Sequence, residues 1–390
     1  MNTPCFVIGL ARSGTNLVAR MLDRHPHVSV ALDPFMPVFR SLRDAIVRES
    51  GDERLQRRYT PRLPFQDYYF DSLAPTLLDS MLGANLDINV GADELEFLRD
   101  ACAERAALES PSLATHMEKL SGQTYAEVFD SMMALLAERN PEAHWVGCKE
   151  VWIEDFVPVL ARALPNSRFI AIERDPRAIV ASLLAISQAN PSQFAHIPSY
   201  VRHWRKGVVL NRRYQKDVGI SGRFHLLNYE SIVTNAEGAA HALCNFLGID
   251  YWPGMTNLSE DGWIGNSGYA HAGRDVYVHS LERWRVSLPS DISAAIDYLC
   301  APEMRLTEYK PISSPCLDAT VARYLLAPRG ETYSWRSDSG DELADLAGEA
   351  LRYALLDAEP IDSEMLLRRC FLFPESYHAI RNAGINRVFQ

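Results

Sequence analysis

The first forty residues contain a strand, a glycine-bounded loop and a helix in immediate succession. Residues 6–8 form an apolar run that is short enough for a buried strand. The chain then turns between Gly9 and Gly14, and a helical pattern follows until His25-Pro26 interrupts it. In this order, the amide groups of the loop and of the first helical turn point to one spot, where the helix dipole favours negative charge. The segment therefore predicts an anion-binding site.

The loop differs from the common phosphate-binding loop in its cation. The common pattern is G-x-x-x-x-G-K-[ST], whose lysine reaches the terminal phosphates and whose hydroxyl holds magnesium. Here the glycine spacing is kept, but Thr15-Asn16 follows the second glycine, and the cation of the loop is Arg12. This favours a phosphorylated ligand that is held by backbone, hydroxyls and an arginine, without a metal. A strand-to-helix turn with incidental glycines is the alternative, because one glycine spacing is weak evidence.

An acidic residue follows the next predicted strand, at residues 28–32. Asp33 precedes Pro34 and would lie just past the carboxyl end of that strand, on the same side as the loop. Open α/β sheets bind their ligands at this edge. A turn or cap residue before proline is the competing interpretation of Asp33.

Composition limits the partners that the chain can have. The formal net charge is −11 over 390 residues, which argues against a general nucleic-acid or anionic-membrane surface. Seven cysteines are scattered without a C-x-x-C pair, which is typical of reduced thiols and favours neither a zinc nor a redox site. There is no basic leader and no apolar run of about 18 residues, so we expect a cytoplasmic protein without a membrane span.

Residues 40–145 interrupt the alternation of strands and helices. Helical patterns recur there, notably at 92–108 and 125–139, and no β-rich run appears. We interpret the segment as a helical insertion that forms a lid or a substrate wall over the sheet edge. The aromatic cluster at 65–70 is expected to pack in a core, with a pocket lining as the alternative.

The sheet resumes at residues 144–149, with Lys149-Glu150 at the end of the strand. Strands predicted at 168–174 and 224–227 follow, each preceded and followed by helices. Alternation from residue 3 to 250 predicts an α/β protein with a parallel, P-loop-type sheet, flanked by helices and followed by a helical C-terminal extension. We place the α/β domain at 1–310 and the extension at 311–390.

A second anion site is suggested by the segment after residue 168. Arg174 stands at the end of a strand, and Ser182 follows eight residues later, two turns into the next helix. A strand end and a helix face can together hold a second phosphate at the same sheet edge. A salt bridge of Arg174 to a neighbouring acid, with Ser182 in helix packing, is the alternative.

Together these segments resemble the sulfotransferases that use 3′-phosphoadenosine 5′-phosphosulfate (PAPS), particularly the branch of tyrosylprotein and bacterial small-molecule enzymes. The resemblance covers residues 3–40 and about 145–290 and rests on the order and spacing of its motifs. It implies PAPS as co-substrate and no metal, with the loop on the 5′-phosphosulfate and the second site on the 3′-phosphate. The donor-binding residues that it implies are Arg12, Ser13, Gly14, Thr15, Asn16, Arg174, Ser182, Tyr229, Asn266 and Ser267.

The same resemblance implies the catalytic residues Asp33, Lys149 and Arg12. Asp33 lies 21 residues after Arg12, where the tyrosylprotein branch has a glutamate that acts as base. Lys149 lies 25 residues before Arg174, which matches the catalytic lysine of that branch. Arg12 and Lys149 would stabilise charge on the bridging and sulfuryl oxygens. Aspartate in place of glutamate shortens the reach by about one methylene, and Glu150 is the rival base.

The acceptor is not contained in these motifs. The acidic composition and the aromatic residues of the insertion favour a small molecule, such as a natural product with a hydroxyl or amine. A protein tyrosine or a glycan is the alternative acceptor within this class. Outside it, the alternatives are a nucleotide-dependent kinase with a degenerate phosphate loop and a non-catalytic nucleotide-binding scaffold. We expect no nucleic-acid or membrane partner, and the C-terminal helices are candidates for homodimerisation or for capping the site.

Overall fold

The computed structural model describes residues 2–59, 61, 65–189, 197–258, 280–326 and 342–388. The chain divides into two compact units. The first unit is drawn from residues 1–62, 80–174 and 214–279, and the second from residues 63–79, 175–213 and 280–390.

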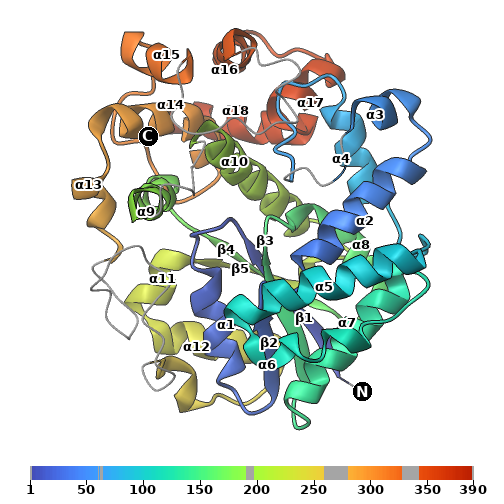
Figure 1. Cartoon of the computed structure of the whole chain (residues 1–390). Coiled ribbons are helices and arrows are strands. Elements are labelled where there is room, and N and C mark those ends of the chain that lie inside the picture. The colour runs from blue at the N-terminus through green and yellow to red at the C-terminus, as the bar shows by residue number, and fades with distance from the viewer. Residues whose placement is uncertain are drawn as a thin grey trace. The chain divides into compact units, whose positions relative to one another are not determined.

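A five-stranded parallel sheet forms the centre of the first unit (Figure 1). Its strand order is β2-β3-β1-β4-β5, so β1 lies between β3 and β4. Gly9 at the end of β1 is in register with Val151 of β3 and with Ile172 of β4. All carboxyl ends therefore meet at one edge, which confirms the predicted sheet. The strands are β1 (Thr3–Gly9), β2 (Val28–Leu32), β3 (Trp145–Val151), β4 (Arg168–Glu173) and β5 (Phe224–Asn228).

Helices flank this sheet, and its strands are buried almost completely. Every residue of β2 is buried, as are residues 5–9 of β1, which explains why these strands are continuous apolar runs and do not alternate. The helices of the first unit are α1 (Thr15–Asp23), α2 (Met36–Glu49), α3 (Glu53–Arg58), α5 (Ala92–Glu109), α6 (Pro111–Ala114), α7 (Tyr125–Arg139), α8 (Val157–Ala163), α11 (Tyr229–Thr234) and α12 (Ala236–Leu247). Short 3₁₀ turns lie at Met117–Lys119, Glu154–Phe156, Ser221–Arg223 and Pro253–Thr256.

The expected helical insertion is present between β2 and β3, where the described elements are helices α2 to α7 and one 3₁₀ turn. Two element ends differ from the expectation. β3 continues to Val151, so Lys149 and Glu150 lie inside the strand and not at its end. Tyr229 begins α11, whereas the sequence pattern placed it at the end of a strand.

The second unit is helical in the part that the structure describes. Its helices are α9 (Pro176–Ala189), α10 (Ile197–Tyr214), α13 (Arg283–Ser287), α14 (Ser290–Met304), α15 (Ala319–Leu326), α16 (Glu342–Asp357), α17 (Glu364–Phe371) and α18 (Pro374–Val388), and α4 (Ala74–Gly83) contains a boundary between the units. The sequence analysis assigned no element to α14, although Ile292, Ile296 and Leu299 are all buried on it.

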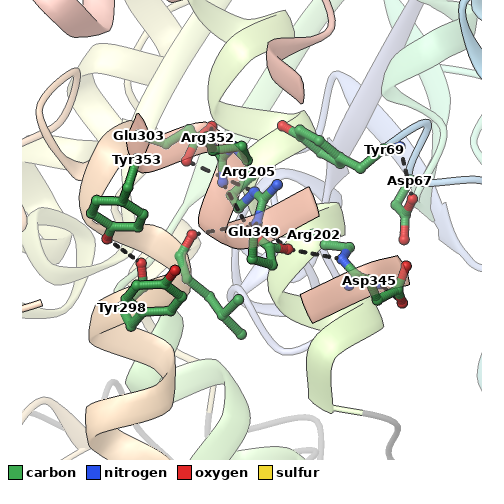
Figure 2. A network of polar contacts seen from close by, with 11 residues as sticks. Asp67, Tyr69, Arg202, Arg205, Tyr298, Glu303, Asp345, Glu349, Arg352 and Tyr353 are labelled. Atoms are coloured by element: carbon green, nitrogen blue, oxygen red, sulfur yellow. Dashed lines mark hydrogen bonds and ion pairs between the residues drawn. The ribbon is translucent and has the colours of Figure 1, made fainter. Parts of the chain in front are cut away.

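A buried ionic network connects α10, α14 and α16 within this unit (Figure 2). Arg205 donates to Glu349 at 2.8 Å, and Arg202 binds the same carboxylate at 3.2 Å. Arg352 pairs with Glu303, and both side chains are inaccessible to solvent. The guanidinium of Arg205 also lies 4.0 Å from the centroid of the Tyr69 ring. Tyr69 and its neighbours in the aromatic cluster are buried, as expected of core residues.

Replacement of Glu349 by glutamine should destabilise the protein by about 3–5 kcal/mol, because it leaves buried arginines without their carboxylate. Urea denaturation measures this change. Glu375→Gln is the matched control, since Glu375 pairs with Arg213 at the surface, where such a pair contributes at most about 1 kcal/mol. Equal destabilisation by both variants would contradict the importance of the network.

The effect should also depend on pH. Burial alone would raise the pKa of Glu349, but Arg205, Arg202 and Arg352 hold it below its usual range. A depressed carboxyl pKa stabilises the fold above the unfolded-state pKa of about 4.3, and this stabilisation is lost as the pH falls. The difference between wild type and Glu349→Gln should therefore shrink in acid.

Candidate active site

The loop between β1 and α1 has a backbone that few residue types adopt. Arg12 has φ 73° and Gly14 has φ 102°, both in the left-handed region. A Cβ added to Gly14 would collide with the ring of Tyr229, so only glycine fits there. The amide of Ser13 donates to the carbonyl of Leu10 at 3.0 Å, which closes the turn before α1 begins at Thr15.

Two polar side chains of this loop are buried with unmet hydrogen-bonding capacity. Ser13 Oγ and Asn16 Nδ2 have no hydrogen-bond partner among the described residues, and both residues are at most 9% exposed. Buried polar groups are nearly always satisfied, by protein, water or ligand. Together with the helix N-terminus, they are candidate hydrogen-bond partners for an anion.

Arg174 connects the loop to the ends of β4 and β5. Its Nη1 donates to the carbonyl of Arg12 at 2.9 Å, and its guanidinium lies 4.0 Å from the centroid of the Tyr229 ring. Tyr229 in turn lies against Gly14. Loop, arginine and tyrosine, which are separated by more than 200 residues along the chain, therefore form one packed group at the sheet edge.

Asp33 and Lys149 form an ion pair at the same edge. The amide of Asp33 donates to the carbonyl of Lys149 at 2.8 Å, which extends the pairing of β2 and β3 by one bond. Lys149 Nζ then donates to Asp33 Oδ2. Asp33 Oδ1 is buried and accepts no hydrogen bond from any residue that the structure describes. The carboxylate is thus oriented by the lysine and retains one oxygen that can accept a proton.

Glu150 is held in a different environment. It is fully buried, and its Oε1 accepts a hydrogen bond from the amide of Phe35 at 2.6 Å. Burial raises the pKa of Glu150 well above its usual range, and the charge of Asp33 raises it further. With no exposed surface and one oxygen held by a backbone amide, Glu150 is not accessible to an acceptor hydroxyl in this conformation.

Three further predicted donor-binding residues do not belong to the described part of the first unit. Ser182 lies on α9 in the second unit and is 8% exposed. Asn266 and Ser267 lie outside the described residues.

His25, which lies close to the loop along the chain, has the structural role that its place before proline suggested. It is buried, and its Nε2 is 2.9 Å from the carbonyl oxygen of Asp250. Burial lowers its pKa. The ring therefore contributes to the end of α1 and not to the chemistry.

The sequence analysis missed Trp152, which follows β3 directly. Its amide donates to the carbonyl of Gly9 at 3.2 Å, and its φ is 63°. A bulky residue in the left-handed region indicates backbone strain, which collects at functional sites. No feature of the sequence marks a bulky residue that adopts this conformation.

The described residues contain no group of three or more His, Cys, Asp or Glu side chains that could hold a metal ion. Nor do they contain a helix with the length and apolarity that a membrane crossing requires.

The parallel sheet and the loop between β1 and α1 define a P-loop-like α/β protein whose loop lacks the usual lysine–hydroxyl pair. More narrowly, the chain belongs to the sulfotransferase family, because the model of that family matches residues 4–254.

Individual relatives are distant. Carbohydrate sulfotransferase 3 of Tetronarce californica is 28% identical over 42% of this chain. The alignment spans only 41% of that relative's own length. Protein-tyrosine sulfotransferase 2 of Gallus gallus is 24% identical over 62% of this chain and 67% of its own. Among solved structures, the sulfotransferase domain of the Synechococcus PCC 7002 olefin synthase is similar at 14% identity, with a TM-score of 0.43 over 74% of this chain and 90% of its own.

Replacement of Gly14 by alanine should weaken binding of 3′-phosphoadenosine 5′-phosphate (PAP) at least about tenfold, because the new methyl group displaces Tyr229 and strains the loop. Isothermal titration calorimetry measures the affinity. Gly83→Ala is the control, since a Cβ at Gly83 meets nothing within 4 Å. Unchanged affinity in a folded Gly14→Ala protein would remove the loop from donor binding.

Proposed function

We propose that the protein transfers a sulfuryl group from PAPS to a hydroxyl or amine of a small-molecule acceptor by in-line displacement. One observation carries the proposal: the Asp33–Lys149 pair, with its available Oδ1, lies at the same sheet edge as the candidate anion-binding groups of the loop. The chain's membership in the sulfotransferase family supports it.

The residues of the first unit fit the donor. Ser13 Oγ and Asn16 Nδ2 would hold the 5′-phosphate together with the loop amides and Thr15, because they are buried donors without other partners in the described structure. Arg174, which is stacked on Tyr229, would hold the 3′-phosphate, a role for which the resemblance also implies Ser182. Asn266 and Ser267 complete the proposed set. When bound, PAPS supplies a sulfuryl group that its phosphosulfate anhydride already activates.

The chain's own residues would then perform positioning and charge stabilisation. Lys149 and Arg12 would stabilise the charge that develops on the bridging and sulfuryl oxygens, which is worth about 3–4 kcal/mol per donor in comparable sites. Asp33 Oδ1 would accept the proton of the acceptor hydroxyl while the new sulfur–oxygen bond forms. Because Lys149 already binds Oδ2, the carboxylate needs no reorientation before it acts.

The acceptor is proposed to be a small molecule. The relatives include a carbohydrate sulfotransferase and a protein-tyrosine sulfotransferase, so the family uses chemically different acceptors. Helices α2 to α7 follow Asp33 along the chain and are proposed as the wall of the acceptor space. A cytoplasmic location, which we also propose, would be consistent with a small-molecule acceptor.

Thermal denaturation with different nucleotides tests the donor. PAP should raise the melting temperature by several degrees, since a ligand at about 100 times its Kd adds about 2.7 kcal/mol of stability. ATP with magnesium should have no such effect. Stabilisation by ATP with magnesium but not by PAP would favour the phosphotransferase alternative, and no effect of either would favour a scaffold.

Replacement of Lys149 by alanine should lower kcat by about 10²–10³, while PAP affinity stays within about threefold. Asp33→Asn should lower kcat by about 10²–10⁴ through loss of the base. Lys119→Ala is the control, because Lys119 pairs with Glu138 at the surface. Steady-state kinetics and calorimetry measure both quantities, and a Lys149→Ala enzyme with wild-type turnover would exclude Lys149 from the mechanism.

A further inference from the structure

A cavity of about 850 Å³ lies within the first unit. One face of α2 and one face of α5 form two of its walls, and the residues after α3 and at the end of β3 form the others. Its lining residues are Met36, Pro37, Arg40, Ser41, Asp44, Val47, Arg48, Gln56, Tyr59, Pro61, Glu94, Phe97, Ala101, Glu104, Arg105, Val151 and Trp152.

The cavity adjoins the proposed catalytic pair on both strands. Met36 follows Asp33 by three residues, and Val151 follows Lys149 by two. Between them, the amide of Phe35 is hydrogen-bonded to Glu150, which joins the two chain segments at this end of the cavity. Asp33 and Lys149 do not themselves line the cavity, so an acceptor bound there would have to extend past Met36 and Val151 to reach Asp33.

The size and the walls indicate the kind of molecule that fits. Pockets for small molecules measure about 300–1,000 Å³ and are mostly apolar, with a few polar groups. Met36, Val47, Phe97 and Trp152 contribute apolar and aromatic surface to this cavity. Such walls suit an aromatic or aliphatic body better than a sugar, whose hydroxyls need many hydrogen-bond partners.

Two of the acidic residues that line the cavity are already engaged. Asp44 pairs with the buried Arg43 at 2.9 Å and accepts a hydrogen bond from Tyr59 at 2.6 Å. Glu94 accepts a hydrogen bond from Ser41. Asp44 is thus paired with a cation, whereas Glu94 is hydrogen-bonded but keeps its charge, and Glu104 is exposed to solvent.

Arg105 also lines the cavity, and one of its hydrogen-bond donors is unused in the described structure. Its Nε is buried and has no hydrogen-bond partner in the described part of the chain. Its positive charge also acts on the nearby Glu150, whose pKa it lowers against the larger effect of burial. Arg105 is therefore a cation close to the catalytic edge, with a donor that is not yet used. A guanidinium forms two parallel hydrogen bonds with a carboxylate, which a neutral group cannot match.

We propose that this cavity binds the sulfuryl acceptor and that Arg105 selects acceptors which carry a carboxylate on an aromatic body. The inference rests on the proposed sulfuryl transfer. It goes further by naming the substrate class and the residue that determines it.

Three phenols of nearly equal shape test the selection. They are 4-hydroxyphenylacetate, its neutral amide 4-hydroxyphenylacetamide, and the cation tyramine. The full chain with PAPS should give a KM for the acid that is at least about tenfold lower than for the amide, a difference typical of a charged hydrogen-bonded pair. Tyramine should be the poorest of the three.

Matched variants assign the selection to one side chain. Arg105→Met should raise the KM of the acid to that of the amide, so that the acid-to-amide ratio of KM becomes about one. Arg105→Lys should recover part of the preference, because it keeps the charge and loses the fork. Arg48→Gln is the control: Arg48 lines the same cavity, but it is exposed and pairs with Glu49.

Binding without the donor separates this inference from the proposed function. Line broadening of the acid in NMR spectra should depend on Arg105 even when PAPS is absent. Arg105-dependent binding of the acid without sulfuryl transfer would support the selectivity of the cavity and would contradict the proposed sulfotransferase function. Transfer with an unchanged acid-to-amide ratio in Arg105→Met would overturn the inference alone. Preferred sulfation of a tyrosine peptide or a chondroitin oligosaccharide, or no binding of any phenol, would overturn it as well.

Discussion

The position of β1 between β3 and β4 is the constraint on which the rest of the site depends. Because all three strands run in parallel and in register, Gly9, Val151 and Ile172 end side by side. Backbone pairing alone therefore brings three segments to one edge: the loop after β1, the end of β3 with Lys149, and Arg174 after β4. β2 adds Asp33 through one further backbone hydrogen bond, to the carbonyl of Lys149. Parallel strands buried on both faces cannot slip by one residue without moving apolar side chains, so the geometry of the edge is specified by the core.

Buried charged and polar groups occur in both units, and both units retain some unused hydrogen-bonding capacity. In the second unit, three arginines and three carboxylates form ion pairs between helices, although Arg205 Nη2, Arg352 Nε and Glu303 Oε2 make no hydrogen bond within the described residues. In the first unit, Asp33 Oδ1, Ser13 Oγ and Asn16 Nδ2 stay without partners among the described residues. Every charge of the second-unit network has an ionic partner, whereas Ser13 Oγ and Asn16 Nδ2 have no partner in the described structure, which is costly unless water or a ligand satisfies them.

Much of the fold was predictable because the strands and loop leave local signals. The range 28–32 of β2 and the range 125–139 of α7 agree with the structure at both ends, since proline, asparagine and apolar periodicity mark them. The position of Asp33 and Lys149 at one edge followed from the rule that parallel strands share their carboxyl ends. The cavity and the role of Arg105 were not predictable. They depend on how α2 and α5 face each other. The periodicity of a sequence identifies the apolar face of a helix, but it does not identify the element that packs against that face. Trp152 was missed because a positive φ at a bulky residue has no signature in the sequence.

The backbone at Asp33 accounts for the departure from the glutamate that the tyrosylprotein branch has at this place. Asp33 has φ 48°, a left-handed conformation in which aspartate and asparagine are enriched and longer side chains are uncommon. The main-chain conformation at this position therefore favours aspartate over glutamate, independently of any catalytic requirement. A glutamate at this position would gain reach at the expense of local backbone strain. If Asp33 acts as the proposed base, its shorter side chain would require the acceptor hydroxyl to lie about one bond length closer to the sheet than a glutamate would, so the φ angle at this residue would affect how deeply the acceptor binds.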